Sequence, residues 1–248
     1  IEKFKELVLE ERQTLPHDPR WTEYLRDADQ RQELPLRRIG QWIAPSADPA
    51  FTRWAKTNTR EQKQLGYLVV TIALPLGDIT ANQLRALADI ARQFTRETIR
   101  TTVEQNIVLR WVARSDLLDL YKALDAVRLA DPGAESIADI TSCPGTDTCK
   151  LGISSSRGLA AELRSRVLAK GDQLDQSIQD LHIKISGCFN SCAQHHAADL
   201  GFYGVSRKIG GYAVPHFQVV LGGEWTHNAG SYGMPVMAIP SKNIPEVV

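Results

Sequence analysis

With 248 residues, 43% of them apolar, the chain can bury the core of one large domain or two small ones and is too hydrophobic to be disordered. Lys and Arg together number 29, as do Asp and Glu, so the formal net charge is zero and the chain as a whole is not expected to bind nucleic acid. Its longest apolar run, Tyr67–Leu76, contains Pro75 and is about half as long as a membrane helix, and no secretory signal opens the sequence.

Residues 1–60 are predicted to form a connecting arm and not a separate domain. Phe4, Leu7 and Val8 can lie on one side of a short helix. Prolines then interrupt the segment repeatedly, at Pro16, Pro19, Pro35, Pro45 and Pro49. Tryptophans are expected to anchor the arm on a neighbouring part of the protein, at Trp21, Trp42 and Trp54. The chain begins without Met and ends without a visible signal, which we interpret as a piece of a longer protein.

Residues 61–133 show the element order of a ferredoxin-like α/β sandwich, which is strand, helix, strand, strand, helix. The strands are expected where β-branched and aliphatic residues are dense, at residues 67–74, 99–103 and 107–112. Thr80 is expected to begin the first helix, because Gln83 follows three residues later as in a capping box. Ser115 is expected to cap the second helix.

Residues 134–248 are predicted to form a mixed α/β domain, which makes the fold class α+β. A first strand at residues 137–141 is expected to lead to the first cysteine, and a half-buried strand at 181–186 to lead to the third. The other expected elements are a helix at 158–169, a turn and short helix at 188–198, and strands at 200–205 and 216–221.

The four cysteines of the chain form two close pairs. Five residues separate Cys143 from Cys149, and three separate Cys188 from Cys192. Both segments contain Gly, which lets backbone amides approach a cluster closely. So few cysteines do not make a disulfide scaffold, and we therefore expect a reducing, cytoplasmic compartment with the thiols kept for metal binding or catalysis.

Three interpretations of the cysteines compete. Buried free cysteines can act as small hydrophobic residues, although two tight pairs beside Gly and Pro are unusual for that role. In structural zinc sites, two to four residues commonly separate the two cysteines of a pair. The second pair has this spacing, and the first pair is more widely spaced. A cubane iron–sulfur cluster tolerates wider spacing, and the spacing therefore favours it over zinc.

The residues around the cysteines resemble the cluster-binding signatures of the siroheme-dependent nitrite and sulfite reductases. The similarity includes the cysteine spacing, the segment Gly187–Gly204, the pair Gly222-Gly223 after a strand, and Arg100–Asn106 upstream. It covers about residues 66–245. Phe189 stands where that family usually has Pro, a difference that alters loop stiffness and removes no ligand.

The resemblance implies two cofactors, a 4Fe–4S cluster and siroheme. It implies that Cys143, Cys149, Cys188 and Cys192 hold the cluster and that Cys192 also ligates the siroheme iron, joining the two cofactors. Asn190, inside the second pair, is the further catalytic and cofactor-binding candidate. Other cofactor contacts are expected at Arg100, Gln105 and Asn106, on the strand pair that resembles the family's cofactor-facing strands.

The activity that the resemblance implies is the six-electron reduction of nitrite to ammonia or of sulfite to sulfide. Electrons would come from a ferredoxin or flavoprotein type of donor, since no nicotinamide-binding motif is present. The pattern occurs once in this chain, as in the C-terminal half of a larger reductase or in the small single-copy sulfite reductases. The arm at residues 1–60 favours the first interpretation, in which an N-terminal half is missing. The alternative function is a metal-stabilised binding or scaffold module without catalysis. No nucleic-acid or membrane partner is expected.

Overall fold

The computed structural model describes residues 2–16, 18–20, 22–23, 33–37, 48–96, 98–224 and 231–248. The chain divides into two units, Ile1–Leu34 and Pro35–Val248. In the first unit the predicted short helix is confirmed as α1 (Glu2–Thr14), which buries none of its residues. Trp21 and Trp42, two of the predicted anchors, lie outside the described residues.

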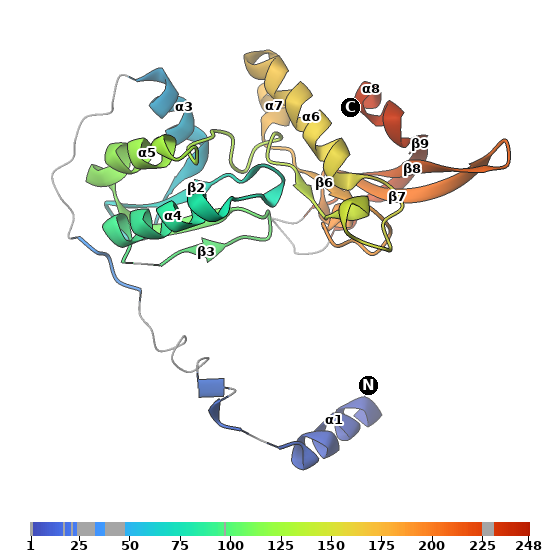
Figure 1. Ribbon diagram of the computed structural model, residues 1–248, viewed down its shortest axis with the longest axis horizontal. Helices are drawn as coiled ribbons and strands as arrows, with labels where there is room; N and C mark the ends of the chain where they lie inside the picture. Colours follow the sequence, from blue (N-terminus) through green and yellow to red (C-terminus); the bar gives the residue numbers. More distant parts are fainter. Residues whose placement is uncertain are drawn as a thin grey trace. The chain divides into compact units, whose positions relative to one another are not determined.

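The second unit begins with a four-stranded antiparallel sheet in the order β1-β2-β4-β3. Its strands are β1 (Thr59–Glu61), β2 (Tyr67–Ile72), β3 (Arg100–Thr101) and β4 (Ile107–Ala113). Two helices, α4 (Ala81–Phe94) and α5 (Leu117–Ala126), share a core with it (Figure 1). The predicted element order and the α+β class are thus confirmed.

The helix starts show how local sequence placed these elements. The predicted capping box of α4 is confirmed, because the Thr80 hydroxyl accepts from the Gln83 amide and the Gln83 side chain accepts from the Thr80 amide. The predicted Ser115 cap is wrong. Ser115 lies in a 3₁₀ turn, Arg114–Asp116, and Asp116 occupies the cap position of α5 without a side-chain capping bond.

The helix α3 (Pro49–Asn58) packs into the same core as the first sheet. Trp54 is completely buried, and its ring centroid lies 5.1 Å from that of Tyr121 on α5. Phe51 packs edge-on against Tyr121 at 5.4 Å. Trp54 is therefore an anchor, as predicted, and the end of the stretch predicted as an arm contributes to this core.

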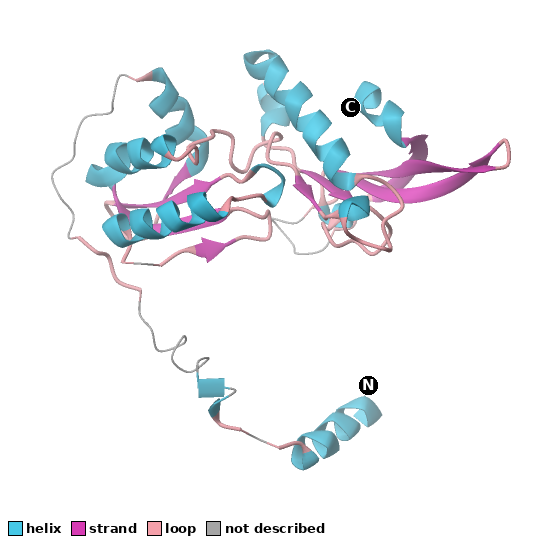
Figure 2. Ribbon diagram, in the orientation of Figure 1, coloured by secondary structure: helices cyan, strands magenta, loops and turns pink. Residues whose placement is uncertain are grey.

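The second sheet has five strands in the order β5-β6-β7-β8-β9. They are β5 (Thr141–Ser142), β6 (Ile183–Ser186), β7 (Leu200–Ile209), β8 (Tyr212–Leu221) and β9 (Met234–Pro240). The first three are parallel and the last three antiparallel. Figure 2 shows the strands of the protein in magenta and its helices in cyan. The accompanying helices are α6 (Ser156–Lys170), α7 (Gln176–Gln179) and α8 (Ile244–Val247). Among the described helices, none has both the length and the hydrophobicity that crossing a bilayer requires.

The strand β6 differs from its prediction. Alternating apolar and polar residues led us to expect one solvent-facing side, but all four residues are buried. Ile183 and Ile185 belong to the core shared with α6, while Lys184 and Ser186 are buried although they are polar. The second face of β6 is therefore a buried polar surface, and it lies just before the second pair of cysteines.

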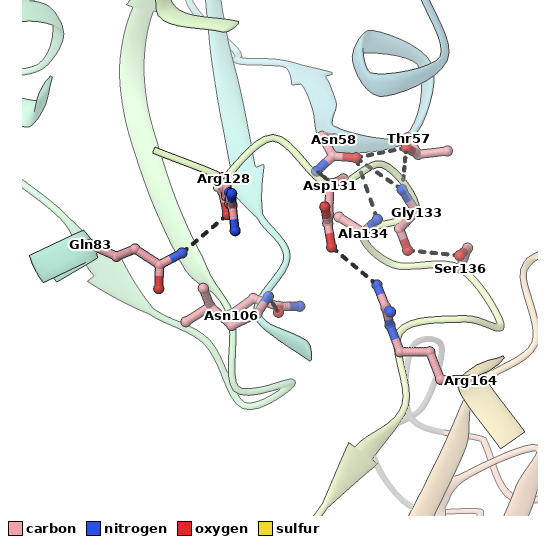
Figure 3. A network of polar contacts seen from close by, with 11 residues as sticks. Thr57, Asn58, Gln83, Asn106, Arg128, Asp131, Gly133, Ala134, Ser136 and Arg164 are labelled. Atoms are coloured by element: carbon pink, nitrogen blue, oxygen red, sulfur yellow. Dashed lines mark hydrogen bonds and ion pairs between the residues drawn. The ribbon is translucent and has the colours of Figure 1, made fainter. Parts of the chain in front are cut away.

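Asn58, at the end of α3, ties that helix to the first sheet and to the segment that leads to the second (Figure 3). Its amide nitrogen donates to the carbonyls of Thr71 (2.9 Å) and Asp131 (3.0 Å). Its oxygen accepts from the amides of Gly133 (3.2 Å) and Ala134 (3.5 Å). Asn58 is 1% exposed, so water cannot reach these backbone groups to take over the hydrogen bonds of its side chain.

We expect Asn58→Ala to lower the free energy of unfolding by about 2–4 kcal/mol, because the substitution strands buried carbonyls and amides without partners. Urea unfolding at pH 7 measures the effect. Asn82→Ala is the matched control, since Asn82 is exposed and accepts a surface hydrogen bond from Arg85. It should change stability by less than about 0.5 kcal/mol. Equal losses in the two variants would show that the buried network is not the cause.

Candidate metal centre

The two cysteine segments follow neighbouring parallel strands. We call residues 143–149 the first knot and residues 188–192 the second knot; β5 leads into the first and β6 into the second. Ser142 pairs with Ile185, so both knots leave the sheet at the same edge. The Cys143 amide donates to the Ile185 carbonyl at 3.1 Å, and the Gly187 amide donates to Cys143 Sγ at 3.1 Å. The structure thus brings the two knots together.

Glycines allow the backbones of the two knots to touch. A Cβ atom added at Gly187 would lie 2.7 Å from Cα of Gly145 and 3.0 Å from the carbonyl oxygen of Ser154. The Gly187 carbonyl accepts from the amides of Ile153 (2.8 Å) and Ser154 (3.1 Å). A Cβ on Gly204 of β7 would overlap that same carbonyl. These positions require glycine because of close approach and not because of backbone conformation.

The spacing of the four thiols along the chain favours a cluster over a single ion. Cys143 and Cys188 are buried, whereas Cys149 and Cys192 are exposed. Within the described ranges, no three Cys, His, Asp or Glu side chains are gathered closely enough to hold one metal ion. Structural zinc needs four ligands around one point, while a cubane is larger and takes its thiolates from a wider arc. The hydrogen bond from the Gly187 amide to Cys143 Sγ is of the kind that stabilises the sulfur ligands of a cluster.

Gln105 connects the first sheet to the first knot. It lies in the turn between β3 and β4 and has a positive φ of 68°. Its side-chain nitrogen donates to the Ser142 carbonyl at 2.8 Å, and its oxygen accepts from the Ser142 amide at 3.2 Å. Both ends of the amide therefore fix the residue before Cys143.

Asn106 has a similar structural use. It is 1% exposed, accepts from the Leu74 amide at 2.9 Å and donates to Asp139 Oδ2 at 2.7 Å. Arg100 is exposed on the edge strand β3, and Asn190 is exposed within the second knot. Direct cofactor contacts by Arg100, Gln105, Asn106 and Asn190 stay predictions.

A cavity of about 480 Å³ lies beside the first knot. Gln105, Asn106 and Thr101 line it together with Ser142 and Pro144, which flank Cys143. Most of its other lining is apolar: Leu74, Leu76, Ile79, Leu84, Ile99 and Ile107. Two predicted cofactor residues thus line a cavity that adjoins the first knot.

Arg157 also lines the cavity, but its guanidinium contacts protein partners. It donates to the Leu76 carbonyl at 2.9 Å and pairs with Asp78 and Asp147. A guanidinium engaged in this way links α6 to the first knot and to the turn after β2, and it offers less charge to a bound anion.

A polar network behind the second knot was missed from the sequence. The Ser186 hydroxyl accepts from the Ala193 amide at 3.2 Å and shares a hydrogen bond of 2.9 Å with Nδ1 of His195. Nε2 of His195 lies 3.1 Å from Nε2 of His196. Lys184 donates to Gln194 Oε1 at 3.4 Å. The available signal was the alternation along β6, which places Lys184 and Ser186 on one face.

Burial shifts the titration of this region. It lowers the pKa of Lys184, an effect that the carboxylates of Glu104 and Asp139 partly offset. It raises the pKa of Asp139, against the hydrogen bonds from the Glu135 amide and Asn106. Burial, with a smaller effect of His196, lowers the pKa of His195 from 6.5 to about 4. Low polarity thus disfavours charge on each group.

The shift at His195 predicts a specific dependence of stability on pH. Between about pH 6.5 and 4 the unfolded chain binds a proton that the native His195 does not, so stability is complete above pH 6.5 and falls as the pH is lowered. We expect the Tm to fall by about 5 °C more in the wild type than in His195→Gln over this window. Thermal unfolding at pH 7, 6, 5 and 4.5 checks the difference, and parallel profiles would contradict it.

Comparison with known proteins adds independent evidence. The family model described as the nitrite/sulfite reductase ferredoxin-like half domain matches residues 60–127, and the nitrite and sulphite reductase 4Fe-4S domain matches residues 133–248. A ferredoxin–nitrite reductase of Synechococcus elongatus is 26% identical over 209 residues, which is 82% of this chain. A ferredoxin sulfite reductase of Mycobacterium tuberculosis is 34% identical over 170 residues, or 66% of this chain.

A solved structure of the Mycobacterium tuberculosis NirA protein superposes with a TM-score of 0.65 and 28% identity, covering 77% of this chain and 35% of that one. The chain spans 40% of the Synechococcus protein and 30% of the mycobacterial sulfite reductase. Both family models and the cysteine geometry agree. The chain therefore belongs to the siroheme-dependent nitrite and sulfite reductase family, whose cofactors are a 4Fe–4S cluster and siroheme.

Proposed function

We propose that this chain is the cluster-bearing part of a larger reductase that converts nitrite to ammonia or sulfite to sulfide. The observation that carries the proposal is the meeting of the two knots at one edge of the second sheet, with all four cysteines of the chain in them. The family model described as a 4Fe-4S domain spans residues 133–248, the part of the chain that contains all four cysteines, and this supports the proposal. Either reduction needs six electrons. Amino-acid side chains do not carry out such electron transfer, so a redox cofactor is required.

The proposed roles of the cysteines follow from the resemblance of their motifs to those of the family. Cys143 and Cys188, both buried, and Cys149 hold the cluster. By its position in the motif that resembles the family, Cys192 would also ligate the siroheme iron, and its exposed thiol is compatible with that role, although Cys149 is exposed as well. When bound, siroheme and cluster supply the electrons for reduction of the small anion.

The other proposed cofactor-binding residues, apart from Asn190, line the cavity beside the first knot or lie next to its lining. Gln105 and Asn106 line it, and Arg100 is adjacent to Thr101, which lines it as well. Arg100 would offer positive charge to siroheme carboxylates. Asn190 lies two residues before Cys192 and would donate a hydrogen bond near the substrate.

The proposed partners are a small anion, an electron donor and a further segment of protein. Relatives named as ferredoxin–nitrite reductase and ferredoxin sulfite reductase support a ferredoxin donor. Because this chain spans 30–40% of them, the rest of the enzyme would include a second half. A reducing cytoplasmic compartment fits thiols that must remain available for a cluster.

Anaerobic purification tests the proposal directly. We expect about four irons and four acid-labile sulfides per chain, with the visible bands of siroheme. Steady-state reduction of nitrite and of sulfite, with a chemical reductant and then with reduced ferredoxin, identifies substrate and donor. Stoichiometric zinc in a colourless protein would exclude the function. A cluster without siroheme or turnover, even after the second half is added, would favour the scaffold alternative.

A further inference from the structure

The backbone around Cys192 is held in an unusual conformation. Ser191 and Gln194 both have left-handed φ values, 58° and 59°, which residues with a Cβ seldom adopt. The Gln194 amide donates to the Ser191 carbonyl at 2.8 Å. Cys192 and Ala193 are thus the two central residues of a tight turn, and the direction of the Cys192 side chain depends on that turn.

One buried face of β6 supports this turn from behind. Ser186 accepts the Ala193 amide (3.2 Å), and Ala193 is 2% exposed. Ser186 also bonds His195 Nδ1 (2.9 Å), and His195 is completely buried and stacks on Tyr203 with ring centroids 4.6 Å apart. Lys184, one step back on the same face, donates to Gln194. Every residue of segment 193–195 therefore contacts a polar side chain of β6.

The chemistry of the Ser186 hydroxyl suits this role. A hydroxyl can accept one hydrogen bond and donate another at the same time. Ser186 can accept from the Ala193 amide while donating to Nδ1 of a neutral His195, whose Nε2–H then points to His196. No apolar residue could replace both bonds, and a buried amide without a partner is costly.

We propose that Ser186 and His195 are positioning residues that fix the direction of the Cys192 thiolate, and through it the coupling between the cluster and siroheme. The coupling rests on the proposed function, whereas the support of the turn does not. Neither residue is assigned to a ligand or to the substrate. A thiolate shared by two cofactors must point at both, so the turn that carries it has to be rigid.

Hydrogen exchange of the Ala193 amide tests the support of the turn. In Ser186→Ala this exchange should be about ten-fold faster than in the wild type, and Ser186→Thr, which keeps the hydroxyl, should restore protection. Ser154→Ala is the matched control, because Ser154 is equally buried but its hydroxyl donates to the His216 carbonyl on β8. Unchanged exchange at Ala193 in Ser186→Ala would overturn the proposal.

The coupling is tested in the cofactor-loaded protein by the midpoint potential of the siroheme iron. We expect Ser186→Ala to keep about four irons and sulfides yet shift this potential, with Ser186→Thr and Ser154→Ala near the wild type. A potential that does not move in Ser186→Ala would overturn the positioning role. A wild-type chain that binds no siroheme even after the second half is added would refute the proposed function, while the exchange experiment would still decide whether Ser186 supports the turn.

Discussion

Replacing Gly187 by Ala is expected to prevent assembly of the metal centre and to lower the free energy of unfolding by about 3 kcal/mol. The added Cβ would lie 2.7 Å from Cα of Gly145 and 3.0 Å from the Ser154 carbonyl oxygen. Both atoms belong to the backbone, so the overlap cannot be relieved by rotating a side chain. The second knot would have to move from the first, which would separate Cys188 and Cys192 from Cys143 and Cys149.

Iron and sulfide analysis with urea unfolding of the same preparations measures both effects. Gly210→Ala is the control, since Gly210 lies in the turn between β7 and β8 and a Cβ there meets nothing within 4 Å. Its positive φ of 56° makes that variant slightly strained, so it should lose about 1 kcal/mol and keep its iron. A Gly187→Ala protein with full iron content would contradict the close approach of the knots.

Cys192→Ser is expected to reduce nitrite or sulfite turnover by at least about a thousand-fold while leaving the fold intact. An alkoxide is a far poorer iron ligand than a thiolate, so the substitution removes one cluster ligand and, in the proposed arrangement, the siroheme ligand as well. Cys192 is exposed, and its hydrogen-bonded neighbour Ala193 keeps its amide partner Ser186. The loss should therefore appear in cofactor content and activity and not in thermal unfolding of the metal-free chain.

Cys149→Ser separates the two roles of Cys192. Cys149 is exposed, as Cys192 is, but it belongs to the first knot and is proposed to hold the cluster alone. Both variants should weaken the cluster, and only Cys192→Ser should also change the visible spectrum of siroheme. Identical spectra in the two variants would place the shared thiolate elsewhere, and full turnover by Cys192→Ser would exclude the bridging role.

Much of the fold was predictable because its signals are local. The capping box of Thr80 and Gln83 begins α4 as expected, and the cysteine spacing favoured a cluster over zinc before the structure placed the knots together. The strand β9 was not predicted. Pro235 and Pro240 interrupt its pattern, and only an edge strand, which pairs with β8 alone, tolerates them.

The support behind the second knot could not be predicted, because it depends on tertiary structure. Lys184 and Ser186 alternate with isoleucines, as polar residues do on a strand with one solvent-facing side. They are buried because segment 193–195 folds back onto them. No local sequence pattern predicts that this segment packs against β6. Gln105 was singled out by its family resemblance, but only the structure shows that its amide holds Ser142.

The pairing of β5 with β6 also bears on the order in which the protein matures. Thirty-eight residues separate Cys149 from Cys188 along the chain, and α6 lies in this intervening segment. If these cysteines are the ligands, as proposed, the ligand set forms only after this crossover has closed, and cluster insertion is expected late in folding. On the proposed ligands the cluster would tie the ends of that loop together, and a cross-link over such a span destabilises the unfolded chain by about 4 kcal/mol. Oxidative loss of the cluster would then loosen the loop as well as end electron transfer.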